Sequence, residues 1–344
     1  MNKPMVAIVI LNWNGWEDTI ECLESLYHID YSNYRIVLVD NNSSNESLLK
    51  IKNYFDGKIK VKSNFFEYNE NNKPIQIKEY SKEESESTTN KKDLTGNNLI
   101  LIKNDKNYGF AEGNNIGIRY ALQILNSDYV LLLNNDTIVD KDFLGEMVDL
   151  GEVDENIGIV GPKIYYYDDP GTIWCIGGKI DWKLARGLHV GTNEVDRGQY
   201  NKTEEFDYVS GSAFLVKREV IDKVGLMDKK FFLYFEESDL ALRAFQNGYK
   251  SVYAPEAKIW HKVSKSGGGL SKPIGLYYIT RNRWLFMKKW AKKSDYIFFV
   301  IYQAVGAIVL PIILSIYYMN WGLFKAYYAG LNDGIAFKNY NLKI

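Results

Sequence analysis

A carboxylate and two amides stand directly after an apolar segment in the middle of the chain. Asn134, Asn135 and Asp136 follow the continuous apolar run 129–133. Such a run is typical of a strand buried in a parallel sheet, and ligands of these sheets bind beyond the carboxyl ends of the strands. A carboxylate placed there suits a hard divalent metal that also holds phosphate. The same residues suit a simple turn, so this stretch alone leaves both interpretations open.

Acidic residues gather a second time after an aromatic run. Residues 231–235 lead directly into Glu236 and Glu237, and Asp239 follows. A carboxyl group beside apolar side chains can have a raised pKa and act as a general base. Acidic residues at a helix N-terminus also complement the helix dipole, and Asp239 lies four residues before Arg243, which favours an ion pair.

Polar side chains end two further apolar segments near the N-terminus. Segment 5–11 runs into Asn12 and Asn14, and segment 35–39 runs into Asp40. Strands and helices alternate here, which is the pattern of a nucleotide-binding half-sheet. We therefore expect these side chains at the same sheet edge as Asp136.

The segment 104–115 is rich in Asn and Gly and precedes a helical pattern. Glycines let the backbone approach a ligand, and a helix N-terminus favours phosphate. The segment has neither GxGxxG nor the GK[ST] of a P-loop, which argues against dehydrogenases and ATPases.

His261 follows another apolar segment and is one of three histidines. A lone histidine is more often structural than a ligand. Its place after a strand, downstream of the acidic residues, keeps metal binding open.

Residues 53–98 interrupt the alternation of strands and helices. We expect a short strand at 58–62 and a solvated or disordered loop at 81–92, which is low in apolar residues. We also expect 184–206, which is polar and glycine-rich, to be a loop.

Bulk composition excludes some classes of protein. The net charge of −1 provides no basic field for nucleic acid, and the two cysteines form no CxxC pattern. The apolar segment at the N-terminus is too short for a signal peptide, so the catalytic part is expected in the cytosol.

The C-terminal part differs in character. Basic and aromatic residues alternate between 281 and 293, and Tyr296–Met319 carries no charge. Its length matches a bilayer span, and preceding basic residues suit anionic headgroups, which predicts membrane association. A buried helical hairpin broken near Gly306 and Pro311 is the alternative, and a span and a re-entrant hairpin both remain open.

Seven stretches together resemble a family-2 glycosyltransferase of the GT-A fold, in the rhamnosyltransferase-like branch: VAIVILNWNG, VLVDNNSSN, NYGFAEGNN, LLLNNDT, VSGSAFLVKR, FLYFEESDLALR and IWH. The resemblance covers Val6 to about Arg283, without 53–98. It implies an α/β domain at 1–283, with a Rossmann-like, mixed and mostly parallel sheet flanked by helices. Residues 284–344 would form an apolar helical, membrane-associated tail.

This resemblance implies inverting transfer of rhamnose or another hexose from a nucleotide-sugar donor to an acceptor hydroxyl. Asp136 matches the last acid of the DxD metal motif, with Asn134 in place of the first acid. His261 matches a histidine that completes the site for Mg²⁺ or Mn²⁺. Glu237 matches the base, with Glu236 and Asp239 as competitors. The positions that match nucleotide-sugar binding are Asn12, Asn14, Asp40, Asn104, Gly109, Phe110, Asn114 and Asn134.

The expected donor is linked to UDP, dTDP or GDP, and the expected acceptor is a glycan or a lipid-linked glycan at the cytoplasmic face of the membrane. Two other functions remain open. A non-catalytic membrane protein that binds nucleotides or glycans would bind donor without turnover. A sugar-nucleotide pyrophosphorylase would need a basic residue in its first glycine-rich loop, and residues 12–15 have none.

Overall fold

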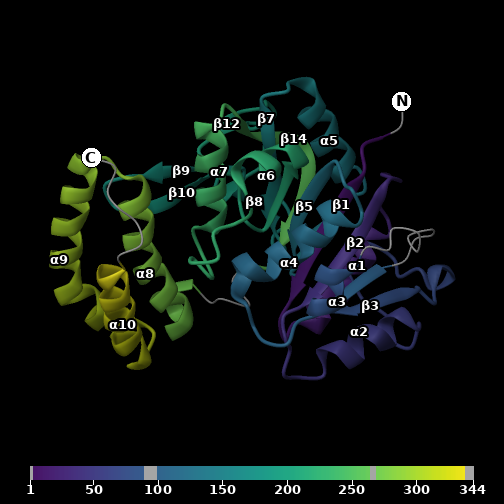
Figure 1. Cartoon of the computed structure of the whole chain (residues 1–344), viewed down its shortest axis with the longest axis horizontal. Helices are drawn as coiled ribbons and strands as arrows, with labels where there is room; N and C mark the ends of the chain where they lie inside the picture. Colours follow the sequence, from purple (N-terminus) through teal and green to yellow (C-terminus); the bar gives the residue numbers. More distant parts are fainter. Residues whose placement is uncertain (1–2, 89–98, 264–268, 338–344) are drawn as a thin grey trace.

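The computed structural model describes residues 3–88, 99–263 and 269–337. These residues form a mixed central sheet with helices on both faces and a separate group of three C-terminal helices (Figure 1). The nine strands on the main path of the sheet lie in the order β11-β8-β7-β13-β5-β1-β2-β4-β3. β14 pairs with β7, β6 and β12 beside this path.

The N-terminal half of the sheet is parallel. Its apolar strands are buried because helices cover both faces, as their continuous Val, Ile and Leu content predicts. The parallel strands are β1 (Val6–Asn12), β2 (Tyr34–Asp40), β3 (Ile77–Ser81), β4 (Leu99–Lys103) and β5 (Tyr129–Asn134).

The second half of the sheet is mixed. β13 (Ala213–Lys217) runs antiparallel to β5 and to β7 (Ile157–Tyr166), and β14 (Lys250–His261) runs parallel to β7. The short β6 (Thr137–Val139) is antiparallel to β14. The remaining strands are β8 (Thr172–Cys175), β9 (Gly177–Asp181), β10 (Arg186–Val190), β11 (Glu194–Val195) and β12 (Glu205–Phe206).

Two apolar cores lie on opposite faces of the sheet. One contains side chains of α1 (Trp16–Leu26), α2 (Ser47–Phe55) and α5 (Phe143–Val153). The other contains side chains of α4 (Gly109–Gln123), α6 (Arg218–Val224) and α7 (Glu236–Gln246). This arrangement confirms the predicted α/β fold with a mixed, mostly parallel sheet.

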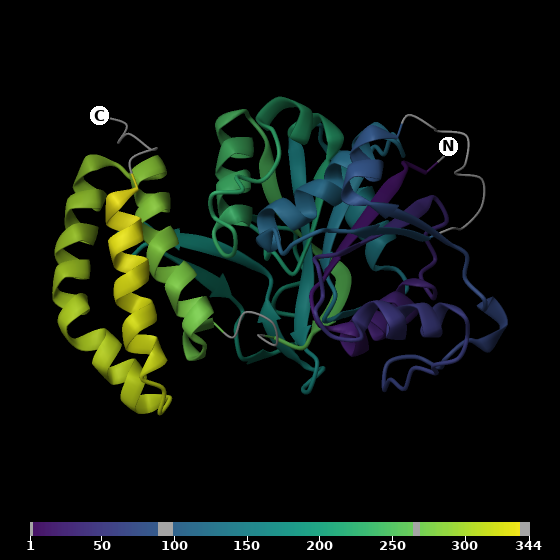
Figure 2. The same ribbon diagram turned by 60° about the horizontal axis from the view of Figure 1, so that its bottom comes forward.

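Three helices, α8 (Pro273–Trp290), α9 (Lys293–Tyr317) and α10 (Gly322–Ala336), pack together at one end of the molecule (Figure 2). The β9–β10 hairpin extends from the sheet domain toward them (Figure 1). Ala185 at its tip packs against Trp284 of α8. α8 runs across the boundary expected between 283 and 284. α9 is continuous through Gly306 and Pro311, so the alternative of a hairpin broken there was wrong.

Three sequence expectations about irregular segments were wrong. Residues 58–62 are not a strand. Ser81 caps α3 (Lys82–Ser87) through a reciprocal pair of hydrogen bonds with Glu84, so a helix begins where a loop was expected. Residues 89–92 of that expected loop lie outside the described residues. Segment 184–206 includes β10, β11 and β12, because β10 pairs with β9 in a hairpin.

Candidate active site

A cavity of about 340 Å³ opens at the carboxyl ends of the parallel strands. Seven of the sequence-predicted site residues line it together: Gly109, Phe110, Asn134, Asp136, Glu236, Glu237 and His261. They come from five separate elements or their ends, so strand ends and loops bring distant parts of the chain to one place.

Asp136 and His261 form the polar floor of this cavity. The antiparallel register pairs His261 at the end of β14 with Thr137 of β6, which places its ring beside Asp136. His261 Nε2 lies 3.2 Å from Asp136 Oδ1, and both residues are buried. Burial alone would raise the pKa of Asp136, but the charge and hydrogen bond of His261 hold it below its usual 3.8. Asp136 is therefore ionised at neutral pH.

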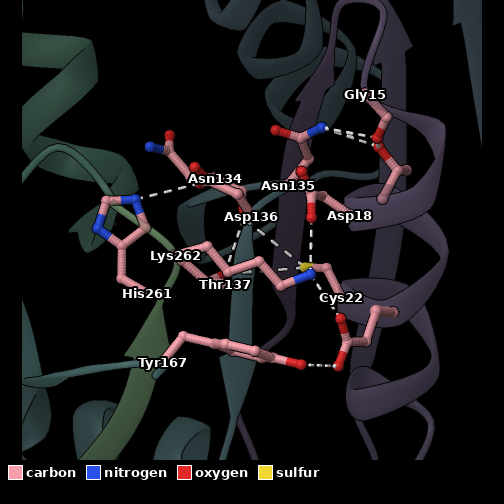
Figure 3. Close-up of polar contacts among 12 residues, drawn as sticks. Gly15, Asp18, Cys22, Asn134, Asn135, Asp136, Thr137, Tyr167, His261 and Lys262 are labelled. Atoms are coloured by element: carbon pink, nitrogen blue, oxygen red, sulfur yellow. Dashed lines mark hydrogen bonds and ion pairs between the residues drawn. The ribbon is translucent and has the colours of Figure 1, made fainter. Parts of the chain in front are cut away.

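Lys262 fixes the direction of the histidine before it. Figure 3 shows the two side chains on opposite sides of β14, with His261 toward Asp136 and Lys262 toward α1. Lys262 Nζ pairs with Asp18 at 2.6 Å and Glu21 at 2.5 Å, and its backbone N–H donates to the Asp136 carbonyl. This buried ion-pair cluster ties the end of β14 to α1.

Glu236 and Glu237 begin α7 and face the same cavity. Glu237 is partly exposed, and burial raises its pKa to about 7. Glu236 is 3% exposed, and its Oε2 has no hydrogen-bond partner among the described residues. Burial, followed by the charge of Glu237, raises the pKa of Glu236 well above 4.5. Burial thus favours the protonated form of both acids, and Glu237 has a pKa of about 7.

Asp239 does not line the cavity. It is fully buried, accepts hydrogen bonds from Arg243 Nε at 2.9 Å and Trp290 Nε1 at 2.8 Å, and pairs with Lys289 at 2.6 Å. The ion-pair interpretation therefore describes Asp239 better than a role as base, and it joins α7 to the end of α8.

The aromatic loop before Glu236 is strained. Phe232, Tyr234 and Phe235 have φ angles of 65°, 70° and 77°, a region that each residue occupies at a cost of roughly 1–3 kcal/mol. Asn282 of α8 compensates this strain, because its buried Nδ2 lies 2.8–2.9 Å from the carbonyl oxygens of Phe231, Leu233 and Tyr234. α8 thereby holds the loop that delivers both glutamates.

Three predicted donor-binding residues, Asn12, Asn14 and Asp40, do not line the cavity. Asn12 Nδ2 donates to Asp40 Oδ1 at 2.7 Å, and both residues are buried. Asn14 has a left-handed backbone and accepts from the backbone N–H of Ser44 at 2.8 Å. These contacts fix the first two loops, and direct contact of these residues with a nucleotide stays a prediction.

Asn41 organises the third loop and was missed by the sequence analysis. Its amide donates to Asn107 Oδ1 and the Gly109 carbonyl, and accepts from Asn104 Nδ2 and the Tyr108 N–H. The side chain of Asn104 thus donates to Asn41 within the protein. A buried asparagine with four partners is a structural anchor of a kind that composition does not reveal.

The sequence analysis expected the N-terminus of α4 to favour phosphate, but its first backbone N–H groups are already bonded within the protein. The backbone N–H groups of Phe110 and Ala111 both donate to the Phe232 carbonyl, and Asn114 Nδ2 donates to the Phe110 carbonyl within the helix. A Cβ on Gly109 would lie 2.5 Å from the Phe232 ring, and its φ is +78°. The glycine is needed for close packing of the two loops.

His189 and Trp174 were also missed. Both line the cavity, and the Trp174 ring lies between His189 and His261, with centroids 4.8 Å from each. Burial, and then repulsion from His261, lower the pKa of His189 below 6.5. His189 belongs to β10, which lies in the segment 184–206 that the sequence analysis predicted as a loop.

The acidic floor fits a divalent cation. Asp136 is a buried carboxylate, and His261 Nδ1 is buried without a hydrogen-bond partner among the described residues. No group of three or more His, Cys, Asp or Glu side chains suited to a metal occurs in the described parts of the chain. Two protein ligands suit Mg²⁺ or Mn²⁺, because these ions take their remaining ligands from substrate phosphates and water.

Two curated relatives are similar over part of their length. The low-salt glycan biosynthesis hexosyltransferase Agl10 of Haloferax volcanii is 26% identical over 57% of this chain and 62% of its own. The N-acetylglucosaminyl-diphospho-decaprenol L-rhamnosyltransferase of Mycobacterium tuberculosis is 26% identical over 41% of this chain and 49% of its own. The matched part thus spans less than two thirds of either relative.

A solved structure supports the fold. The mannosyltransferase PcManGT of Pyrobaculum calidifontis, in complex with GDP-Man and Mn²⁺, superposes with a TM-score of 0.53 at 14% identity, over 98% of this chain and 88% of its own. This likeness shows a GT-A-like arrangement, as the sequence resemblance implied.

Two family models match the chain directly. The model of glycosyl transferase family 2 matches residues 7–73, and that of glycosyltransferase-like family 2 matches residues 90–286. The second match alone covers more than half of the 344 residues. With strand-end loops and an Asp–His pair facing a glutamate of raised pKa, the chain is a member of glycosyltransferase-like family 2.

Proposed function

We propose that this protein is an inverting, metal-dependent glycosyltransferase that moves a hexose from a nucleotide-sugar donor to an acceptor hydroxyl. One observation carries the proposal. A single cavity holds an ionised Asp136 beside His261 and a Glu237 whose pKa is about 7. Asp136 and His261 suit the diphosphate of a donor, and Glu237 suits removal of a proton from the acceptor hydroxyl.

Glu237 supplies the base in this proposal. Its ionised carboxylate accepts the proton of the acceptor hydroxyl, whose oxygen forms a bond to the anomeric carbon. The bond from that carbon to the diphosphate oxygen breaks, and the nucleoside diphosphate leaves with the bonding electrons. Because one displacement occurs on the face opposite the leaving group, the configuration inverts.

Asp136 and His261 would hold the metal. A divalent cation held there would neutralise the charge that develops on the leaving diphosphate. Asn134 in place of a first acid leaves this floor with one fewer negative charge. Lys262 keeps His261 directed at Asp136 through its ion pairs with Asp18 and Glu21.

The proposed acceptor is a glycan on a lipid carrier at the cytoplasmic face of the membrane. The mycobacterial relative is named for a substrate on diphospho-decaprenol, a lipid carrier, which supports this class of acceptor. Among the described helices, α9 alone is long and apolar enough to cross a membrane. Ile274 near the start of α8 lines the cavity, so the site borders the first of the three C-terminal helices.

The test is a donor screen with the full chain in mild detergent. Binding and slow hydrolysis of UDP-, dTDP- and GDP-sugars are measured with Mg²⁺, Mn²⁺ or EDTA. We expect one donor to bind only with metal, and Asp136→Ala to lose that binding. Asp142→Ala removes an equal charge at an exposed position near α5 and should bind normally.

Glu237→Gln separates catalysis from binding in the same screen. We expect it to keep donor affinity and to lower transfer by at least about 100-fold, the lower end of general-base contributions. Full transfer in this variant would place the base elsewhere. If no donor bound under any metal condition, the nucleotide-sugar assignment would be wrong.

A further inference from the structure

One side of α9 is apolar and uncovered. The exposed side chains recur at helical spacing, so they lie on one side of the helix: Ile297, Phe298, Ile301, Tyr302, Val305, Ile308, Val309, Ile312, Ile313 and Ile316. Phe299, Gln303 and Leu314 on the other side are buried against α8 and α10. An exposed apolar surface of this length on a soluble domain indicates a binding surface.

The helices that pack against α9 are not suited to the interior of a bilayer. α8 carries Arg281, Arg283, Lys288 and Lys289, and α10 carries Lys325 and Asp333. Charged side chains near the middle of a membrane are costly. α9 can cross a bilayer only by separating from both neighbours, whereas it can lie along the bilayer surface with its packing intact.

Arg283 of α8 is half-buried and pairs with no carboxylate in the part of the chain that the structure describes. Its Nε is buried and makes no hydrogen bond to any described residue. Its electrostatic neighbours are Tyr302 of α9, Tyr327 of α10 and Arg186 of the β9–β10 hairpin, and Arg186 repels it. Arg186 already pairs with Asp181 at 3.4 Å, whereas Arg283 has no anion beside it in the described parts of the chain, which is unfavourable for a guanidinium whose Nε is buried.

The two ends of the apolar side suit the headgroup region. Lys292 and Lys293 are exposed at the start of α9, and Lys183 Nζ lies 5.7 Å from the centre of the Phe298 ring. Tyr317, Tyr318 and Trp321 are exposed at the other end. Basic residues attract anionic lipids, and Tyr and Trp favour the membrane–water interface.

We propose that α9 lies in the plane of an anionic phospholipid bilayer, with its exposed side in the boundary between headgroups and acyl chains, and that a lipid phosphate pairs with Arg283. This inference deepens the membrane-bound part of the proposed function and rests on it. The orientation brings the β9–β10 hairpin, and with it His189 at the cavity wall, to the membrane side of the molecule.

Vesicle flotation tests the surface. The full chain, without detergent, is mixed with vesicles of phosphatidylcholine alone or with 30% phosphatidylglycerol. We expect flotation with the anionic vesicles and at least a tenfold loss of partitioning in Val309→Asp, which is 50% exposed in the wild type. Val153→Asp on α5 introduces the same charge at a 76% exposed site and should float normally.

Arg283→Gln tests the phosphate. We expect it to keep binding to neutral vesicles and to lower the preference for phosphatidylglycerol about fivefold, as loss of one basic contact predicts. An unchanged preference would overturn the phosphate pairing. Inhibition of transfer by free inorganic phosphate, without vesicle binding, would assign Arg283 to a soluble anion instead.

Thiol labelling distinguishes lying on the bilayer from crossing it. Both native cysteines are buried, so Met319→Cys at the far end of α9 and Ser294→Cys at its start provide reporters. With protein added outside vesicles, a membrane-impermeant maleimide should label both positions. Protection of residue 319 alone would show a span and overturn the proposal.

The experiments distinguish an error in the proposed membrane surface from an error in the proposed function. Donor binding is measured in each preparation, and it should be normal in Val309→Asp and Arg283→Gln because neither residue lines the cavity. If the protein did not bind vesicles but formed a dimer that Val309→Asp dissociated, the proposal would be wrong. A second copy of the chain would then cover this surface.

Discussion

Two adjacent acids in this site have different chemical capacities. Glu236 is enclosed and has an unsatisfied oxygen, whereas Glu237 is partly exposed and has a pKa near 7. A general base works best when its pKa is close to the operating pH, which favours Glu237. Burial and the charge of Glu237 raise the pKa of Glu236 and so favour its neutral form beside Glu237.

The pH dependence of transfer follows from Glu237. The base acts only in its ionised form, so we expect kcat/KM to rise about tenfold per pH unit below 7 and to level off above it. The measurement is a profile from pH 5 to 9 with saturating metal. A rate that stayed constant from pH 5.5 to 8 would contradict this assignment.

Glu236 should reduce stability as pH rises. Its pKa is higher in the folded state than the ordinary 4.5, so the folded state binds more protons and the free energy of unfolding falls as pH increases above 4.5. Glu236→Gln removes this effect. In urea unfolding, the free energy of unfolding of Glu236→Gln relative to the wild type should be higher at pH 8 than at pH 5. Glu256→Gln, at an exposed position, should show no such change.

Individual site residues were predictable where they follow strong strands. Asp136 and His261 end apolar segments, and the register of β6 and β14 then brings them together. Asn41 and His189 were not predictable in this way. Asn41 resembles any turn asparagine until its four partners are in place, and His189 depends on a hairpin formed by an exposed, weakly apolar segment.

At the scale of elements, the loop between α6 and α7 depends on a distant helix. Three residues with left-handed φ angles occur within four positions, and aromatic side chains do not favour that region. Arg281 Nη2 and Asn282 Nδ2 of α8 both donate to the Phe231 carbonyl. The position of Glu237 is therefore set from outside its own helix.

Asn282→Ala should weaken catalysis more than donor binding. Losing the donors to three carbonyls lets the loop relax, and a shift of about 1 Å in a catalytic group can lower rates about 100-fold. We expect most of the loss in kcat, with an unchanged pH midpoint, because Asn282 positions Glu237 and touches no substrate. Asn332→Ala on the exposed side of α10 is the matched control. A loss confined to the donor KM would contradict the positioning role.

Element prediction succeeded where hydrophobic periodicity was strong. The buried parallel strands could be read from their Val, Ile and Leu runs. The direction of β13 could not be predicted, because the same apolar segment suits a parallel or an antiparallel strand. Its pairing with β5 and β7 determines that direction. α3 was missed because its capping box sits in a polar stretch without an apolar periodicity.

At the scale of the whole molecule, membrane docking and transfer should separate experimentally. Val309→Asp leaves the cavity intact, so we expect normal transfer to a water-soluble acceptor and at least a tenfold loss with an acceptor anchored in anionic vesicles. Both rates are measured with the same enzyme preparation. Equal losses with both acceptors would mean that the substitution disturbs the site itself.

The position of β14 has a consequence for how the protein is made. His261 is the last residue of that strand, and the Asn282 that holds the glutamate loop follows on α8, so the two final contributions to the site leave the ribosome late. The nascent chain can fold its parallel half earlier, because domains are synthesised from the N-terminus. The site is thus completed immediately before the proposed membrane-docking helix emerges, and a chain truncated before α8 would carry every strand of the sheet but would lack the Asn282 that holds the glutamate loop.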